Sequence, residues 1–306
     1  MADIAFVFPG QGSQHPGMGR ELYDTNEAAR NVFDEAEASL PGVLDMIWNS
    51  DEQELAKTSN TQPALFCVEL ASAAALTGAG VSPDRLAGFS LGEITALAFS
   101  GAVRRADGFK MVKLRSQLMQ KASEALNSSM AAVLKLDDEA VESVCREFSG
   151  IYPVNYNCPG QIVVSGPAGS LAIFGQRIKE LGGRSMPLKV GGAFHSPYMA
   201  EAANEFGEGL SSFDIKAPKI PLYSNRTAEP YGGGDVVALL TEQMRSPVLW
   251  SKTIQNMVRD GTGTFVEVGP GKVLSGLISR ISPDAVVYNV EDAGSLEKVV
   301  DEFAER

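Results

Sequence analysis

Apolar residues follow two alternating patterns over the first 125 positions of the chain. The run IAFVF at positions 4–8 is short and wholly apolar, which predicts a buried strand ending at Pro9-Gly10. A second short run, RLAGFS, predicts another strand that enters a turn. Helical spacing of apolar residues occurs in GRELYDTNEAARNVFDEAEASL, ALFCVELASAAALTGAG, LGEITALAFSG and RADGFKMVKLRSQLMQKASEAL. This alternation predicts a parallel sheet with helices on both faces.

The pattern changes near residue 125. Strand-like and helical segments then follow in the order β-α-β-β-α-β, which describes a ferredoxin-like unit. They are SSMAAVLKL, DDEAVESVCREF, YPVNYN, QIVVSG, SLAIFGQRIKELGG and SMPLKV. We therefore expect an α/β fold with a large α/β-hydrolase-like domain over residues 1–123 and 192–306. A small ferredoxin-like subdomain over residues 124–191 would be inserted into it.

The last third of the chain returns to longer helical patterns separated by short strands. A helix is predicted in AFHSPYMAEAANEFGEGLSSF and a strand in PLYSN. Two further helices are predicted in VVALLTEQM and SKTIQNMVRDG, followed by a strand in TFVEVGPG. These segments would complete the large domain.

Composition excludes several classes of protein. The chain has 306 residues, of which 44% are hydrophobic, enough for one large domain or two unequal ones. Its net charge of −12 argues against a nucleic-acid-binding protein, which needs a basic surface. Three cysteines without metal-ligand spacing favour a reducing compartment and no zinc site. No apolar run is long enough for a membrane span, so we expect a soluble cytoplasmic protein.

A serine flanked by glycines stands between a predicted strand and a predicted helix, in AGFSLGE. The pattern G-x-S-x-G in this context is the nucleophile elbow, whose tight turn exposes the serine Oγ. The start of the following helix offers N–H groups to a developing oxyanion. The pattern alone is weak in a chain with 31 glycines. Ser90 is therefore either a nucleophile or a turn residue.

A serine nucleophile needs a base, and the chain has only two histidines. His15 lies in the loop GQGSQHPGMG and His195 in GGAFHSPYM. Either could be a structural histidine. His195 is the better candidate because Gly191 and Gly192 leave its approach uncrowded. No aspartate can be assigned as a third member, and a backbone carbonyl or an amide could orient the ring instead.

Two further segments have both a structural and a functional interpretation. The loop GQGSQHPGMG fails the phosphate-binding patterns because His15 stands where a glycine is required. Its N–H groups could complete an oxyanion hole, with Gln11 well placed, or it could be a plain glycine-rich turn. Arg115, in FKMVKLRSQLMQK, is either a solvated helix arginine or a binding group for a substrate carboxylate.

More motifs are distributed along the chain, from IAFVFPGQGSQ near the start to VEVGPGKVLSGL near the end. Between them lie TQPAL, GFSLGE, KLRSQLMQ, NCPGQIVVSG, GAFHSPYM, SNRTA and EQMRSPVLW, in that order. So many separate motifs are far more specific than one G-x-S-x-G pattern. With them, nearly the whole chain resembles the malonyl-CoA:acyl carrier protein transacylases of fatty acid synthesis and the related acyltransferase domains of polyketide synthases.

The resemblance implies roles for the reacting residues. Ser90 would carry the acyl group and His195 would be its base. Gln243 would help to orient His195. The main-chain N–H groups of Gln11 and Leu91 would form the oxyanion hole.

The resemblance also implies substrate-binding residues. Arg115 would hold the free carboxylate of the malonyl group, and Gln62 and Asn157 would line the site. The sequence GAFHS indicates selectivity for malonyl rather than methylmalonyl groups. The family usually has GHSLGE where this chain has GFSLGE. Phe89 cannot form the hydrogen bonds of a histidine, so we expect it to alter the shape and strictness of the acyl pocket.

The implied reaction moves a malonyl group from malonyl-CoA to the phosphopantetheine thiol of acyl carrier protein through a malonyl-Ser90 ester. It is a ping-pong reaction that needs no metal or other cofactor. The expected partners are acyl carrier protein and malonyl-CoA, with no nucleic acid and no membrane, and the protein is expected to be a monomer. The carrier is expected to dock on a local basic patch, for which the candidates are Lys110, Lys113, Arg184 and Lys189.

Three alternatives stay open from the sequence. A serine hydrolase or thioesterase would use the same serine and histidine with water as the acceptor. A free-standing acyltransferase of a polyketide assembly line would use the same chemistry with another carrier. A non-catalytic carrier-binding protein is supported only by Phe89.

Overall fold

The computed structural model describes residues 3–188, 190–232 and 235–304 and contains two separate sheets. Lys189, one of the candidates for the basic patch, lies outside these ranges. The larger sheet has five strands in the order β7-β2-β1-β8-β9, and all its pairings are parallel. Its strands are β1 (Asp3–Phe8), β2 (Arg85–Gly88), β7 (Leu222–Tyr223), β8 (Thr262–Val268) and β9 (Val286–Val290).

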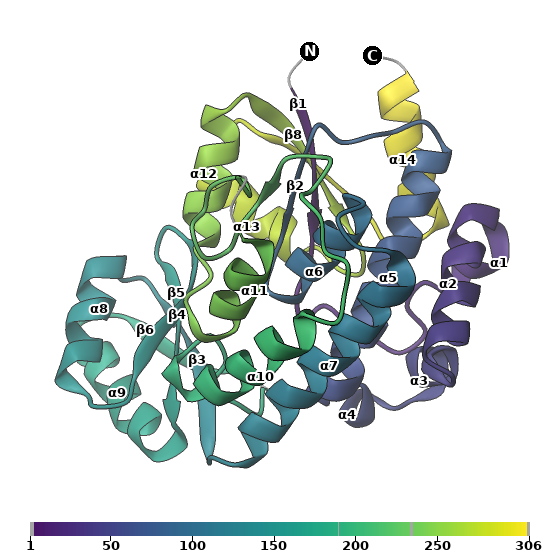
Figure 1. Ribbon diagram of the computed structural model, residues 1–306. Coiled ribbons are helices and arrows are strands. Elements are labelled where there is room, and N and C mark those ends of the chain that lie inside the picture. The colour runs from purple at the N-terminus through teal and green to yellow at the C-terminus, as the bar shows by residue number, and fades with distance from the viewer. Residues whose placement is uncertain (1–2, 189, 233–234, 305–306) are drawn as a thin grey trace.

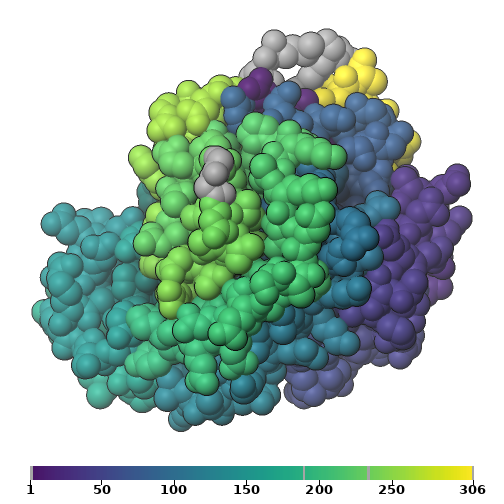
Figure 2. Space-filling model, viewed as in Figure 1, coloured from purple at the N-terminus to yellow at the C-terminus, as the bar shows by residue number. Residues whose placement is uncertain are grey.

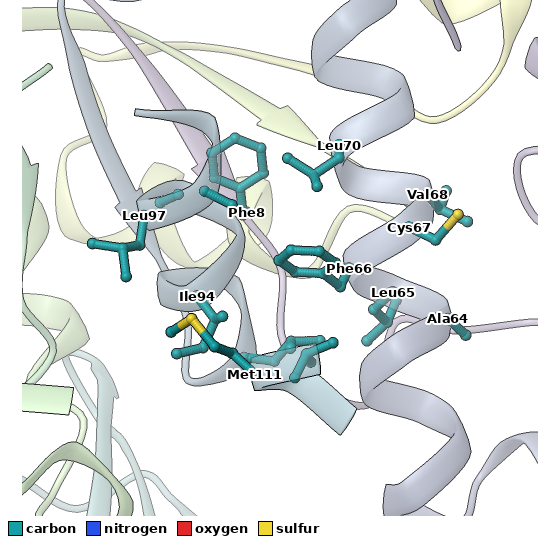
Figure 3. Close-up of a cluster of buried hydrophobic side chains, with 14 of the residues drawn as sticks. Phe8, Ala64, Leu65, Phe66, Cys67, Val68, Leu70, Ile94, Leu97 and Met111 are labelled. Atoms are coloured by element: carbon teal, nitrogen blue, oxygen red, sulfur yellow. The ribbon is translucent and has the colours of Figure 1, made fainter. Parts of the chain in front are cut away.

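Helices cover both faces of this sheet, as the alternating pattern predicted (Figure 1). Side chains alternate across a strand, so β1 sends Phe6 and Phe8 into one core and Ala5 and Val7 into the other. The first core is formed with α2 (Glu27–Ser39), α5 (Thr58–Gly78), α6 (Leu91–Phe99) and α7 (Arg105–Glu124), and part of it is shown in Figure 3. The second is formed with α12 (Trp250–Arg259) and α13 (Val273–Ile281).

The remaining helices of the large domain each add buried residues to the first core. They are α1 (Arg20–Thr25), α3 (Val43–Asn49), α4 (Glu52–Leu55), the 3₁₀ helix η1 (Pro197–Met199), α10 (Ala200–Leu210), α11 (Val236–Arg245) and α14 (Ala293–Ala304). Among the residues described, no helix combines the length and apolar character needed to cross a bilayer.

Two helical predictions differ from the structure at their starts. The segment predicted as one helix from residue 19 contains two, because Asn26 has extended backbone angles and its side chain accepts the Ala29 N–H as the N-cap of α2. The segment from residue 193 becomes helical only at Pro197. Ser196 caps that turn, and His195 before it has a φ of 58°.

The smaller sheet has four antiparallel strands in the order β4-β5-β3-β6, and with its helices it has the predicted β-α-β-β-α-β order. Its elements are β3 (Ser128–Leu134), α8 (Asp138–Glu147), β4 (Tyr152–Cys158), β5 (Gln161–Pro167), α9 (Ala168–Glu180) and β6 (Arg184–Pro187). One face packs on α8 and α9, and the other adds Met130, Val154 and Val163 to the core of the large domain. Figure 2 shows this teal unit against the green segments of the large domain. The subdomain limits 124–191 stay a prediction.

Candidate active site

Ser90 lies in the sharp turn between β2 and α6, in the strained geometry of a nucleophile elbow. Its φ of 54° and ψ of −99° are rare for a residue with a side chain. The flanking glycines allow this turn to approach β1. A Cβ on Gly88 would lie 1.9 Å from the Gly92 carbonyl carbon, and one on Gly92 would lie 2.1 Å from the Phe8 oxygen. Neither position therefore accepts a side chain.

Asn225, in the loop after β7, holds this turn by two hydrogen bonds. Its Oδ1 accepts the Ser90 N–H at 2.7 Å, and its Nδ2 donates to the Gly88 carbonyl at 2.6 Å. The side chain is fully buried. The sequence alone indicates no role for Asn225, whose only signal is its place in the motif SNRTA.

His195 is the histidine beside the serine. Ser90 Oγ lies 2.7 Å from His195 Nε2, and His195 Nδ1 lies 2.9 Å from the main-chain oxygen of Gln243. Because a carbonyl only accepts, Nδ1 carries the proton and Nε2 is free to accept one from Ser90. Gln243 thus orients the ring through its backbone carbonyl. His15 is exposed and contacts Pro16 instead.

Burial keeps His195 neutral. Desolvation, and then the nearby Arg115 cation, lower the pKa of His195 to about 4. At neutral pH the ring is therefore an unprotonated base. A histidine in this state can take the Ser90 proton without first losing its own.

Arg115 on α7 is fully buried and points at the serine. Its Nη2 donates to Ser90 Oγ at 3.1 Å and to Gln243 Oε1 at 2.8 Å, and its Nη1 donates to Gln62 Oε1 at 2.8 Å. The interpretation as a solvated helix arginine is therefore wrong. Burial lowers the pKa of Arg115 to about 10, so the group stays cationic at neutral pH.

No carboxylate pairs directly with Arg115 within the described ranges, and its Nε has no hydrogen-bond partner there. The groups that touch it are neutral oxygens. A buried cation without an anionic partner is costly, and an incoming carboxylate would supply one. The arrangement therefore fits a substrate that carries a free carboxylate next to its reacting carbon.

A cavity of about 80 Å³ opens in front of Ser90. It lies between the two sheets, because strands of the small sheet contribute one wall and the loops of the large sheet the other. Its lining is Gln11, Gln62, Phe89, Ser90, Leu91, Met119, Met130, Asn155, Leu188, Val190, Phe194 and His195. Six of the nine residues predicted for the site therefore line this cavity. Arg115 and Gln243 are not part of the lining, but they donate hydrogen bonds to the Oγ and the main-chain oxygen of Ser90.

Both candidates for the oxyanion hole lie at the cavity. Leu91 is the first residue of α6, so its N–H has no acceptor within the helix. Gln11 lies in the loop after β1, and its side chain donates to Thr58 Oγ1 at 3.3 Å. The two positions come from neighbouring parallel strands, whose carboxyl ends meet at one edge of the sheet.

Of two further predicted pocket residues, Phe89 lines the cavity and Asn157 does not. Asn157 is buried but is not part of the cavity lining, whereas Asn155, two residues earlier on β4, is. Sequence analysis did not select Asn155, and the pairing of β4 is irregular on both sides of it. Phe89 lines the cavity and packs edge-on against Trp250, with ring centroids 5.5 Å apart.

Glu93 is a further residue that sequence analysis missed. It is fully buried on the first turn of α6 and hydrogen-bonds Gln243 Nε2 at 2.8 Å. The signal available was the last letter of GFSLGE, which by itself reads as a solvated helix residue. The described part of the chain holds no cluster of three or more metal-ligating side chains.

The comparisons with known proteins cover the whole chain. The acyl transferase domain family matches residues 5–304. The malonyl CoA-acyl carrier protein transacylase of Bacillus subtilis is 39% identical over 312 residues, which are 100% of this chain and 98% of that protein. The crystal structure of the malonyl CoA-acyl carrier protein transacylase from Clostridium perfringens superimposes with a TM-score of 0.96 at 38% identity, covering 99% of this chain and 98% of that one.

A third similar protein was solved with its partner. It is a malonyl-transacylase in complex with the acyl carrier protein of a type II polyketide synthase. It has a TM-score of 0.94 and 31% identity, covering 98% of this chain and 100% of that one. These matches confirm the resemblance seen in the motifs. The chain belongs to the acyl transferase family, together with the malonyl CoA-acyl carrier protein transacylases.

Proposed function

We propose that this protein transfers the malonyl group of malonyl-CoA to the phosphopantetheine thiol of acyl carrier protein, through a malonyl ester on Ser90. One observation carries the proposal. Ser90 Oγ lies between the neutral base His195 and the buried cation Arg115, which pairs directly with no carboxylate among the described residues. The names of the relatives support this pair of substrates.

In the first half-reaction, His195 Nε2 takes the proton of Ser90, and Oγ attacks the thioester carbonyl of malonyl-CoA. The N–H groups of Gln11 and Leu91 stabilise the tetrahedral oxyanion. The C–S bond then breaks, and the departing sulfur takes the proton from His195. Free coenzyme A leaves, and a malonyl ester stays on Ser90.

In the second half-reaction, the carrier's thiol gives its proton to His195 and its sulfur attacks the ester. The C–O bond to Ser90 breaks, and Oγ recovers a proton from His195. One thioester has replaced another, so the equilibrium constant lies near unity. The atoms and charges balance without a metal or a redox cofactor.

Arg115 provides the selectivity in this scheme. Its guanidinium presents a planar fork that suits a carboxylate, and the amide oxygens of Gln62 and Gln243 fix its direction. An acetyl group would leave the buried fork without that partner. We assign Phe89 to the apolar wall of the acyl pocket, and we keep Asn157, buried on β4 two residues beyond the lining residue Asn155, as a residue that supports the site.

The carrier protein is the expected acceptor. A second candidate function, transfer to a polyketide carrier, is favoured by the relative that was solved with such a carrier. Of the expected docking residues, Lys110, Lys113 and Arg184 are exposed.

The three cysteines are free and buried, which supports the expected reducing cytoplasm. A monomeric state remains a prediction.

The covalent intermediate is the first thing to test. Wild-type protein and Ser90→Ala would each be mixed briefly with malonyl-CoA and examined by intact-protein mass spectrometry. We expect the mass of one malonyl group on the wild type only, and its loss when holo acyl carrier protein is added. The two candidate functions are separated by comparing how fast a fatty acid carrier and a polyketide carrier each remove the malonyl group from the enzyme.

The same experiment distinguishes a hydrolase. Free malonate accumulating in place of malonyl carrier would overturn the transferase function, since water would then be the acceptor. A malonyl adduct on Ser90→Ala would show that another residue is the nucleophile.

A further inference from the structure

A fully buried carboxylate lies behind the site and takes no part in the proposed reaction. Glu93 is three residues beyond Ser90 on α6, and every group that contacts its oxygens is a donor. Tyr231 Oη donates to Oε1, while Gln243 Nε2 and the Asn225 N–H donate to Oε2 at 2.8 and 3.2 Å. Three converging donors are the surroundings that an ionised carboxylate requires.

The side chain of Gln243 joins this carboxylate to the cation of the site. Its Oε1 accepts from Arg115 Nη2 at 2.8 Å, and its Nε2 donates to Glu93 Oε2 at 2.8 Å and to the Ser90 carbonyl at 2.7 Å. A guanidinium has only donors, so this amide can face Arg115 only with its oxygen. The amide therefore has one orientation, and Glu93 helps to fix it.

The separation between the two charges matters for substrate binding. A direct ion pair would occupy the fork of Arg115 and compete with a substrate carboxylate. With Gln243 between them, the negative charge of Glu93 balances the cation, and no carboxylate of the described residues competes for the fork, whose partners are neutral oxygens. The other titratable groups around Glu93 are Arg115 from α7, Tyr231 from the segment after β7 and, beyond Gln243, His195 from the segment before η1.

We infer that Glu93 is a positioning residue that balances the charge of Arg115 through Gln243, and so sets both the strength of malonyl binding and the ease of proton transfer to His195. The inference rests on the proposed function. When His195 takes the Ser90 proton, the buried site holds a second positive charge next to Arg115. The carboxylate behind Gln243 lowers the cost of that charge, as an aspartate does in a catalytic triad.

This role makes turnover depend on pH near neutrality. Burial raises the pKa of Glu93 to about 7, against the lowering effects of its three hydrogen bonds and of Arg115. Glu93 is therefore charged above pH 7 and neutral below it. The value of kcat should fall as the pH drops through 7, well above the pKa of His195 at about 4.

The test is Glu93→Gln, assayed for malonyl transfer to holo carrier protein from pH 6 to 9. The glutamine can accept from Gln243 and Asn225 and donate to Tyr231, so it removes the charge and keeps the contacts. We expect kcat to fall about tenfold and KM for malonyl-CoA to fall several-fold, because an unbalanced Arg115 holds the carboxylate more tightly. The fall of kcat near pH 7, which is the acid limb of the pH profile, should disappear.

Two other variants separate this role from a structural one. Glu69→Gln makes the same substitution at another fully buried glutamate, on α5, which accepts from Thr95 and does not reach the site; burial raises the pKa of Glu69 well above its usual value, so this variant controls for the change of side chain rather than of charge. It should leave kcat, KM and the pH profile unchanged. Tyr231→Phe removes one donor to ionised Glu93 and should move the limb to higher pH by about half a unit to one unit.

The inference is overturned if Glu93→Gln keeps the wild-type kcat and pH profile, or if it raises KM as a loosened site would. If Glu93→Gln does not fold, the inference is overturned instead by a Tyr231→Phe variant whose kcat falls at the same pH as in the wild type. These results differ from a failure of the proposed function, in which the wild type itself would form no malonyl adduct.

Discussion

At the scale of single residues, burial and hydrogen-bond partners decide between two interpretations that the residue pattern alone does not separate. Arg115 follows Lys110 and Lys113 on α7, and these two exposed lysines give no reason to expect a buried cation. In the fold it is fully buried, with amide oxygens on two sides and Ser90 on a third. The absence of a direct counter-ion, within the residues described, is the property that points to a carboxylate substrate.

Replacing Arg115 tests whether this residue binds the carboxylate of the substrate. Arg115→Ala should lower kcat/KM for malonyl-CoA roughly a hundredfold or more, because charge-assisted hydrogen bonds to the carboxylate are lost. Transfer of acetyl groups should change by less than about tenfold. The measurement is the rate of acyl-enzyme formation with each acyl-CoA. Arg104→Ala, at the exposed start of the same helix, is the control, and equal losses for both acyl groups would contradict the assignment.

At the scale of elements, the site depends on how closely α6 approaches the sheet. The turn from β2 into α6 crosses over the end of β1, and two glycines leave the space for it. The motif G-x-S-x-G is therefore a packing requirement as well as a turn signal. The same approach places the first N–H groups of α6 beside the cavity.

Gly92→Ala should therefore destabilise the protein by about 3 kcal/mol or more, because its Cβ would meet the Phe8 carbonyl, which is backbone and cannot move aside cheaply. Gly276→Ala is the matched control. That glycine is also helical, in α13, but nothing lies within 4 Å of the added Cβ, so the change should be neutral or stabilise by up to about 1 kcal/mol. Urea unfolding measures both, and similar losses in the two variants would refute the packing argument.

At the scale of the whole molecule, the small sheet has two different cores. One face, with α8 and α9, buries Cys145 in a core of its own, while the other face joins the large core that buries Cys67. Burial raises the pKa of Cys145 to about 12 and that of Cys67 well above its usual value, so we expect neither thiol to react in the native state. Each can react only when its own core opens.

Thiol alkylation at increasing urea should therefore label Cys145 before Cys67, because the smaller core gains less from burial and opens first. Peptide mass spectrometry assigns each label to its cysteine. Malonyl-CoA should delay the labelling of both, since the cavity that it fills is lined by both sheets. Labelling of both cysteines at the same urea concentration would instead show that the two units unfold as one.

The sequence by itself determined the features that local spacing encodes. Strand and helix order, the small β-α-β-β-α-β unit and the elbow around Ser90 all follow from neighbours within a few positions, and the motifs gave the family. Only the tertiary structure showed that Arg115 is buried, that the backbone carbonyl of Gln243 orients His195, and that Asn155, Asn225 and Glu93 belong to the site. The physical reason is sequence distance. Ser90 meets His195 across 105 positions and Arg115 meets Gln243 across 128, and no local pattern records which distant side chains a parallel sheet will bring to one edge.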